Sequence, residues 1–119
     1  MGIVRTIHGD VDPATLGVVN AHDHLIRVGA GEVYIDPDHL LVDEDKAAQE
    51  ATYFVEASKR FAPSATIVDM CPASSGRGVL KLRRVVDRVP GLQVIQATGF
   101  HQQKVYLEWR SAKDRKSVV

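Results

Sequence analysis

The stretch Gly17-Val18-Val19-Asn20-Ala21-His22-Asp23-His24-Leu25 begins as a buried strand and ends in two histidines. The β-branched pair at its start is typical of a strand inside a sheet. His22 and His24 are two residues apart, so on a strand both side chains point to one face, with Cα atoms roughly 6.5 Å apart. Two imidazole nitrogens can then approach one metal ion, each about 2.1 Å from it. Asp23 is expected to face the opposite way, toward a layer of helices.

The residue types alone leave two interpretations of this pair open. A metal site and two polar residues that close a strand fit about equally well, because imidazole is a common ligand but two ligands do not complete a site. The sequence on either side of the pair is therefore needed to choose between a metal site and two polar residues that close a strand.

Two helix–strand pairs follow the histidines. Asp43 is expected to open an amphipathic helix, and residues 65–70 form a short apolar run that predicts a second buried strand. A second helix before Pro90 leads to a third strand at residues 92–97. The predicted apolar faces of the two helices are Ala47, Ala48, Ala51, Phe54, Val55 and Phe61, and Val79, Leu82, Val86 and Val89.

The segments before and after the first long strand are expected to be irregular. Val4–Ile7 reads as a short strand, and the chain is expected to turn at residues 8–10. Asp12 followed by Pro13 predicts a capped helical turn through Leu16. Residues 27–39 contain glycine and proline with no helical period, which predicts a long loop.

The order strand, helix, strand, helix, strand with nearly continuous apolar strands predicts an α/β fold made of parallel βαβ units. A doubly wound sheet usually has a glycine-rich turn after its first strand. Here two histidines and a long loop follow that strand instead, which favours the closed (β/α)8 barrel. A barrel takes about 250 residues, so we expect the 119 residues to form a truncated N-terminal portion of about three βα units.

Composition excludes several classes of protein. The chain is 45% hydrophobic and 25% charged, with equal numbers of acidic and basic residues, as in ordinary soluble α/β proteins. It has no apolar run of roughly 20 residues, so no membrane span is expected. Zero net charge argues against nucleic acid as a partner. Cys71 is the single cysteine, so no internal disulfide is expected and the cytoplasm is the expected compartment.

Several blocks in the same order resemble the phosphotriesterase family of the amidohydrolase superfamily. The resemblance runs from about Val4 to Trp109, and its most specific block is the strand that ends in His22 and His24. Relatives more often have glutamate where this chain has Asp23, a mild departure that touches no ligand. The blocks are Val4-Arg5-Thr6, Gly17–Leu25, Ile67-Val68-Asp69, Gly76-Arg77 and Ala97-Thr98-Gly99-Phe100.

The resemblance implies a (β/α)8 barrel with a site for two divalent metal ions, most often zinc, in which His22 and His24 bind the more buried ion. A carboxylated lysine, two histidines and an aspartate would complete the site, and all of them would lie beyond this chain. A metal-activated hydroxide would attack a small-molecule lactone, carboxylic ester or phosphoester. His101 and Arg77 are expected to line the substrate pocket. The chain itself is expected to contain no catalytic residue and to be inactive alone, and the full-length protein is expected to be a homodimer.

Two alternatives remain open at this point. The chain resembles another amidohydrolase, a cyclic amidase or a deaminase, in His-x-His, although the Val-Arg-Thr start and the Ala-Thr-Gly-Phe block speak against this. It could also be a non-enzymatic interaction module.

The residues from Asp114 to Val119 match the translation, in one frame, of a widely used sequencing-library adapter. We therefore expect two parts, a partial barrel domain at residues 1–113 and a non-native tail at residues 114–119. The alternative is a natural basic tail, which the mixture of charged residues also fits.

Overall fold

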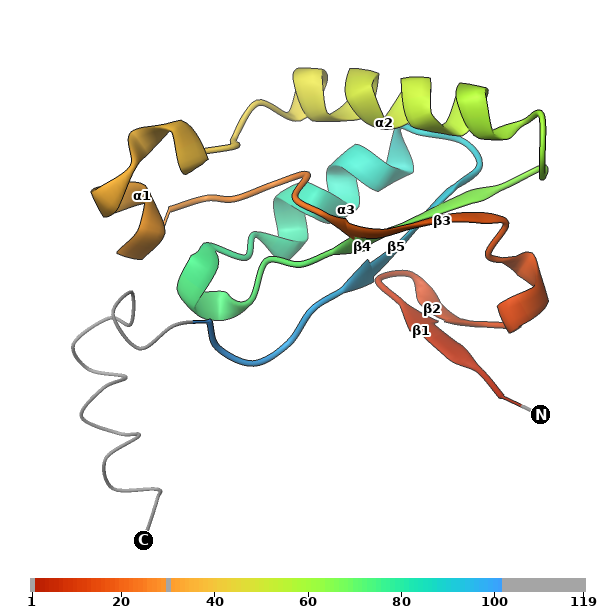
Figure 1. Ribbon diagram of the computed structural model, residues 1–119, viewed down its shortest axis with the longest axis horizontal. Coiled ribbons are helices and arrows are strands. Elements are labelled where there is room, and N and C mark those ends of the chain that lie inside the picture. The colour runs from red at the N-terminus through yellow and green to blue at the C-terminus, as the bar shows by residue number, and fades with distance from the viewer. Residues whose placement is uncertain (1, 30, 102–119) are drawn as a thin grey trace, which may run out of the picture.

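A parallel sheet of three strands forms the centre of the protein. The structure, a computed structural model, describes residues 2–29 and 31–101. The strands β3 (Val18–Asp23), β4 (Ala65–Asp69) and β5 (Leu92–Gln96) lie side by side in chain order, and both neighbouring pairs are parallel. Figure 1 shows the sheet beneath two long helices.

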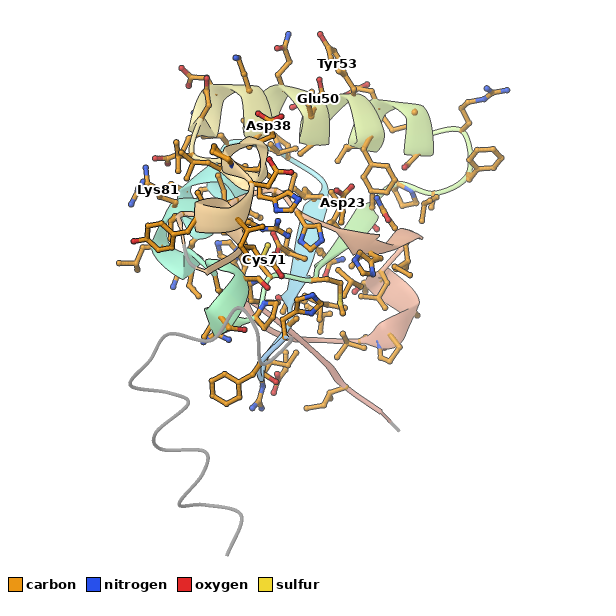
Figure 2. The ribbon with its side chains drawn as sticks, turned by 60° about the vertical axis from the view of Figure 1, so that its left-hand side comes forward. Asp23, Asp38, Glu50, Tyr53, Cys71 and Lys81 are labelled. Atoms are coloured by element: carbon orange, nitrogen blue, oxygen red, sulfur yellow. The ribbon has the colours of Figure 1, made fainter. Side chains whose placement is uncertain are left out.

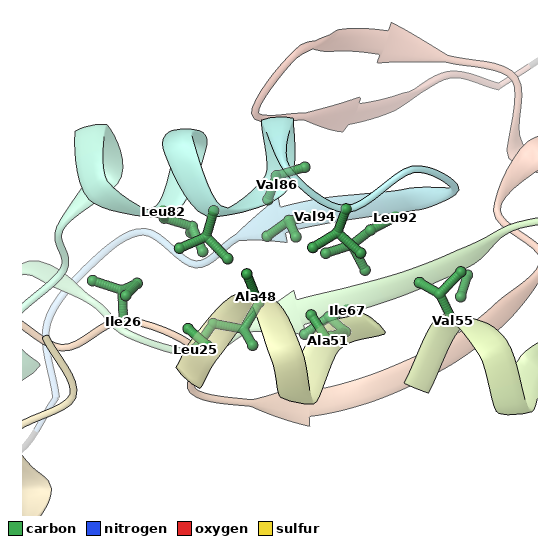
Figure 3. Close-up of a cluster of buried hydrophobic side chains, with 14 residues drawn as sticks. Leu25, Ile26, Ala48, Ala51, Val55, Ile67, Leu82, Val86, Leu92 and Val94 are labelled. Carbon is green, nitrogen blue, oxygen red and sulfur yellow. The ribbon is translucent and has the colours of Figure 1, made fainter. Parts of the chain in front are cut away.

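These two amphipathic helices cover one face of the sheet. Helix α2 (Glu44–Ser58) connects β3 to β4, and α3 (Val79–Asp87) connects β4 to β5 (Figures 1 and 2). Because the strands follow in order and both connections contribute to one core, the sheet is wound in a single direction, as in a closed barrel. The core in Figure 3 consists of Leu25, Ile26, Ala47, Ala48, Ala51, Val55, Ala65, Ile67, Leu82, Val85, Val86, Val89, Leu92 and Val94.

Polar contacts fix the start of α2 and join it to α3. Asp43 caps the helix, as predicted, because its Oδ1 accepts a hydrogen bond from the Lys46 backbone N–H at 3.0 Å. Glu44 accepts hydrogen bonds from Arg84 at 2.8 Å and from Lys81 at 3.3 Å, both on α3. The hydrogen bond from Arg84 is the main reason that the pKa of Glu44 falls to about 2.

An N-terminal hairpin lies beside β5. Strand β1 (Val4–Thr6) pairs antiparallel with β2 (Gly9–Val11), and the Ile7 backbone N–H donates to the Val94 carbonyl at 3.0 Å. The first strand was predicted, but the expected turn at residues 8–10 was wrong in part, because β2 already begins at Gly9. A strand of three residues is too short for alternating polarity to identify it.

A short 3-10 helix and a glycine lead into β3. The helix η1 (Pro13–Thr15) is capped as predicted, since Asp12 Oδ1 accepts a hydrogen bond from the Ala14 N–H at 2.8 Å. Gly17 follows with φ +66°, and a Cβ built on it would lie 1.9 Å from the Ser64 carbonyl oxygen. Both the backbone conformation and the close contact require glycine here.

The segment at residues 27–39, predicted to be a long loop, contains two short helices instead. They are α1 (Gly31–Ile35) and η2 (Pro37–His39). Asp36 caps η2 by accepting a hydrogen bond from the Asp38 N–H at 3.1 Å. Helices of five and three residues cannot show an apolar period in the sequence, which explains the error.

Two residues assigned to apolar helix faces are exposed. Phe61, 79% exposed, lies beyond Ser58, where α2 ends and helical spacing no longer applies. Val79, 43% exposed, is the first residue of α3. Val85, which was not assigned to the face, is fully buried, so the stripe on α3 is centred closer to its C-terminal end than predicted.

Two other expectations concern the ends of the chain and membranes. The tail at residues 114–119 lies outside the described residues, so its non-native origin stays a prediction. Among the helices of the described ranges, none combines the length and apolar character needed to cross a membrane.

The carboxyl group of Asp69 joins the C-terminal ends of the three strands. This side chain is fully buried. Its Oδ2 accepts a hydrogen bond from the Leu25 N–H, just beyond β3, at 3.0 Å. Its Oδ1 accepts from the Cys71 N–H at 3.0 Å and from Gln96 Nε2, on β5, at 3.1 Å. Buried N–H groups need such partners. The Asp69 side chain therefore holds together the segments that follow β3 and β4 and the Gln96 side chain at the end of β5.

We predict that Asp69→Asn lowers the free energy of unfolding by about 1–3 kcal/mol, because an amide NH₂ would face a backbone N–H and leave it unsatisfied. Urea denaturation of both proteins measures the difference. The control is Asp38→Asn at an exposed position, which should change stability by less than about 0.5 kcal/mol. Equal stability of the two variants would contradict the assigned role of Asp69.

We also predict that Gly17→Ala destabilises the chain by about 2 kcal/mol or more, from backbone strain and the clash with Ser64. Gly2→Ala is the matched control, because its Cβ would meet nothing closer than Pro13 Cγ at 4.0 Å. Thermal unfolding followed by circular dichroism compares the two. A normal midpoint for Gly17→Ala would mean that the approach to β3 differs from the one described.

Candidate metal site

His22 and His24 lie at the C-terminal end of β3, the edge where the active sites of barrels form. The pairing of β3 with β4 contains a bulge there: Asn20 pairs with Ile67 but Asp23 pairs with Asp69, which leaves one extra residue in β3. The bulge brings Asn20 and Asp23 to the same face, where Asn20 Nδ2 donates to Asp23 Oδ2 at 2.8 Å. Bulges often adjust side chains at the rims of barrels.

The two imidazole rings are brought together as the sequence predicts. Their centroids are 5.3 Å apart and the ring planes are nearly perpendicular, at 80°. His22 is exposed, whereas His24 is half-buried. Burial, together with the positive charge of Arg27, lowers the pKa of His24 below its usual range. His24 is therefore neutral at physiological pH, the form of imidazole that binds metal ions.

Asp23 lies toward helix α2, as expected. It lines a groove between β3 and α2 that also contains Asn20, His24, Glu50 and Phe54. In Figure 2, Asp23 lies on the side of the strand that faces α2. Its Oδ1 accepts a hydrogen bond from the His24 N–H at 2.7 Å, which helps to fix the backbone between the two histidines.

Cys71, in the loop after β4, contacts the His24 ring. The Sγ atom lies 3.0 Å from His24 Nδ1. The thiol is fully buried. Burial raises its pKa to about 12, and the charge of Asp69 adds to the effect. The thiol is therefore protonated at neutral pH and is no nucleophile there.

His24, Asp69 and Cys71 form a cluster whose ligand atoms all lie within 4.8 Å of one another. Such a group could hold a metal ion in principle. However, both oxygens of Asp69 already accept N–H groups, and burial raises the pKa of Cys71 to about 12, so a metal ion would have to displace the proton of the thiol. The imidazoles of His22 and His24 are the donors best suited to a divalent ion, and they fit the chemistry of zinc.

Arg77 and His101, predicted to line a substrate pocket, lie in loops at this end of the sheet. Arg77 Nη1 donates to the Ala97 carbonyl, just after β5, at 3.2 Å. His101 Nε2 lies 3.2 Å from Glu32 Oε1, and its backbone N–H donates to Ser74 Oγ at 2.8 Å. None of these recorded contacts joins either residue to the histidine pair. Their role in a pocket stays a prediction.

Sequence reasoning missed two buried carboxyl groups near this edge. Asp69 was noted only as part of a family block, and Glu32 was placed in a loop. The Glu32 side chain is 13% exposed and lies 3.3 Å from Arg27 Nη1 and 3.1 Å from Ser75 Oγ. An acidic residue inside the apolar run Ala65–Met70 was the available signal for Asp69. No pattern in the sequence marked Glu32.

The protein is similar to known hydrolases over most of its length. It is 33% identical over 109 residues to a phospho-furanose lactonase of Mycoplasmopsis agalactiae, covering 91% of this chain and 30% of that protein. The crystal structure of an amidohydrolase from Mycoplasma synoviae matches with a TM-score of 0.79 and 37% identity, over 90% of this chain and 30% of the other. A lactonase from Listeria monocytogenes matches with a TM-score of 0.75 and 29% identity, over 86% and 30%.

These likenesses confirm the expected fold, an N-terminal portion of a (β/α)8 barrel, and the chain spans about 30% of the length of these relatives. The profile of the phosphotriesterase family matches residues 2–118. That match covers nearly the whole sequence, including the strand that ends in the two histidines and the buried Asp69. The chain belongs to the phosphotriesterase family.

Proposed function

We propose that this chain supplies the first βα units of a metal-dependent hydrolase that opens a lactone or cleaves a related ester. The observation that carries the proposal is the pair His22 and His24, whose rings meet at the C-terminal end of the first barrel strand. In a barrel this end is the catalytic face. The alternative of two unrelated polar residues would not require the bulge, the buried thiol and the neutral imidazole found around them.

His22 and His24 would hold the metal, His24 as the more buried ligand. Divalent ions bound there would supply a Lewis acid that polarises the oxygen of a carbonyl or phosphoryl group. The chain's own part is to orient the imidazoles: Asp69 fixes the Leu25 backbone directly after His24, and Asp23 fixes the backbone of His24 itself. A rigid second layer of this kind keeps ligand nitrogens directed at one point.

Lactones are the substrate class that the relatives support. Two of the relatives are named a phospho-furanose lactonase and a lactonase, so we place a lactone ahead of other carboxylic esters and phosphoesters. Zinc as the metal, two ions per site and a homodimer rest on the family resemblance and belong to the same proposal. A cytoplasmic location, inferred from the single cysteine, belongs to it too. Residues 1–113 would form the N-terminal part of the barrel, and the remaining ligands would come from later strands.

We predict that His22→Ala and His24→Ala each weaken zinc binding to the chain by at least about tenfold, because each removes one of two imidazole ligands. Isothermal titration calorimetry with zinc measures the affinity. The matched control is His39→Ala, an exposed histidine whose Nε2 lies 3.9 Å from Asp36 Oδ2. Equal zinc affinity in all three variants would contradict a site at the histidine pair.

We further predict that the chain alone hydrolyses no lactone, since two imidazoles leave zinc short of its usual four ligands. A lactonase assay with added zinc tests this. Hydrolysis by the 119-residue chain that is lost in His22→Ala would show that the chain needs no further ligands.

A further inference from the structure

We propose that Cys71 is a positioning residue: its sulfur accepts the Nδ1–H of His24 and so leaves Nε2 as the nitrogen with a free lone pair for a metal ion. The inference deepens the proposed function and rests on it for the metal. Its core is a hydrogen bond between two side chains of this chain, and that bond can be measured without any metal.

The geometry of the contact supports a hydrogen bond. Cys71 Sγ lies 3.0 Å from His24 Nδ1, a close approach for sulfur. Cys71 has no exposed surface, and His24 is half-buried. The sulfur is therefore closed to bulk water. Because a neutral imidazole and a thiol each have one hydrogen to donate, either group could be the donor in this contact.

The side of the ring that faces the thiol indicates which group donates. Nδ1 is the ring nitrogen in contact with the buried sulfur, which leaves Nε2 as the nitrogen available to a metal ion. A neutral imidazole carries one N–H, and a nitrogen that binds a metal ion must keep its lone pair. With Nε2 as the metal-binding nitrogen, the hydrogen is on Nδ1 and the sulfur accepts it.

The same carboxyl group also holds both partners in place. Asp69 Oδ2 accepts the N–H of Leu25, next to His24, and Oδ1 accepts the N–H of Cys71. The two contacting side chains are thus anchored to one buried group at both backbones. In known metal sites a ligating histidine usually donates its second N–H to a partner, and loss of that partner weakens metal binding about 10–100-fold. Cys71 fills this role with a sulfur acceptor.

The first test uses the metal-free chain labelled with nitrogen-15. Long-range proton–nitrogen correlation of the histidine rings reports which nitrogen carries the proton. We expect His24 in the Nδ1–H form in the wild type and a shift toward Nε2–H in Cys71→Ala, which removes the acceptor. Cys71→Ser keeps an acceptor and should retain the Nδ1–H form. An Nε2–H form of His24 in the wild type would overturn the proposal without any need for a variant.

The second test measures zinc affinity in the same proteins. Cys71→Ala should weaken binding by about tenfold, and Cys71→Ser should restore it to within about threefold of the wild type. Val86→Ala is the control for general loss of stability, because Val86 is a core residue on α3. It should leave both the His24 ring signals and the zinc affinity unchanged. A Val86→Ala effect equal to that of Cys71→Ala would overturn the positioning role.

Cobalt substitution separates positioning from direct ligation. If Cys71 were itself a ligand, the cobalt-loaded chain would show a sulfur-to-cobalt charge-transfer absorption that disappears in Cys71→Ser, and this would overturn the proposal. We expect no such absorption. Failure of the wild-type chain to bind zinc would contradict the metal site of the proposed function, whereas the ring signals of the metal-free chain decide the Cys71 contact independently.

Discussion

The buried carboxyl group of Asp69 is the constraint on which the functional end of this protein depends. One side chain accepts hydrogen bonds from the segments that follow β3 and β4 and from Gln96 on β5. Without this acceptor the backbone N–H groups of Leu25 and Cys71 would lose the hydrogen bonds that they make to it, at a buried position. This arrangement places the His24 ring. Asp69 holds the backbone of Leu25, directly after His24, and the backbone of Cys71, whose sulfur contacts the ring.

The sequence was sufficient to predict the architecture and the proximity of the His22 and His24 rings. Long elements with a regular period, such as α2 and the buried strands, were predicted because their apolar residues repeat. The pairing of His22 with His24 was also predictable, since two residues at that spacing on a strand share a face. The short helices α1 and η2 and the strand β2 carry no period. The contact between His24 and Cys71 joins residues 47 positions apart, and no local pattern encodes such a distance.

The open face and edge of the sheet agree with a portion of a barrel. Strand β3 is an edge strand, and its Val19 is 44% exposed. In a closed barrel that face is packed with side chains and that edge pairs with the last strand. The proposed metal site would accordingly be incomplete in this chain: it contains the two imidazoles and the groups that support them, and the further ligands that zinc needs would have to come from other strands.

The most direct test of this account is to read the gene from source DNA beyond the codon for Ala112. The account predicts an open frame with a lysine at the end of the fourth strand, two histidines at the ends of the next two strands, and a late aspartate. Those residues would complete the site that His22 and His24 begin. A stop codon after Val119 in the source DNA would contradict it, and the metal-hydrolase function would then have to be withdrawn for this chain.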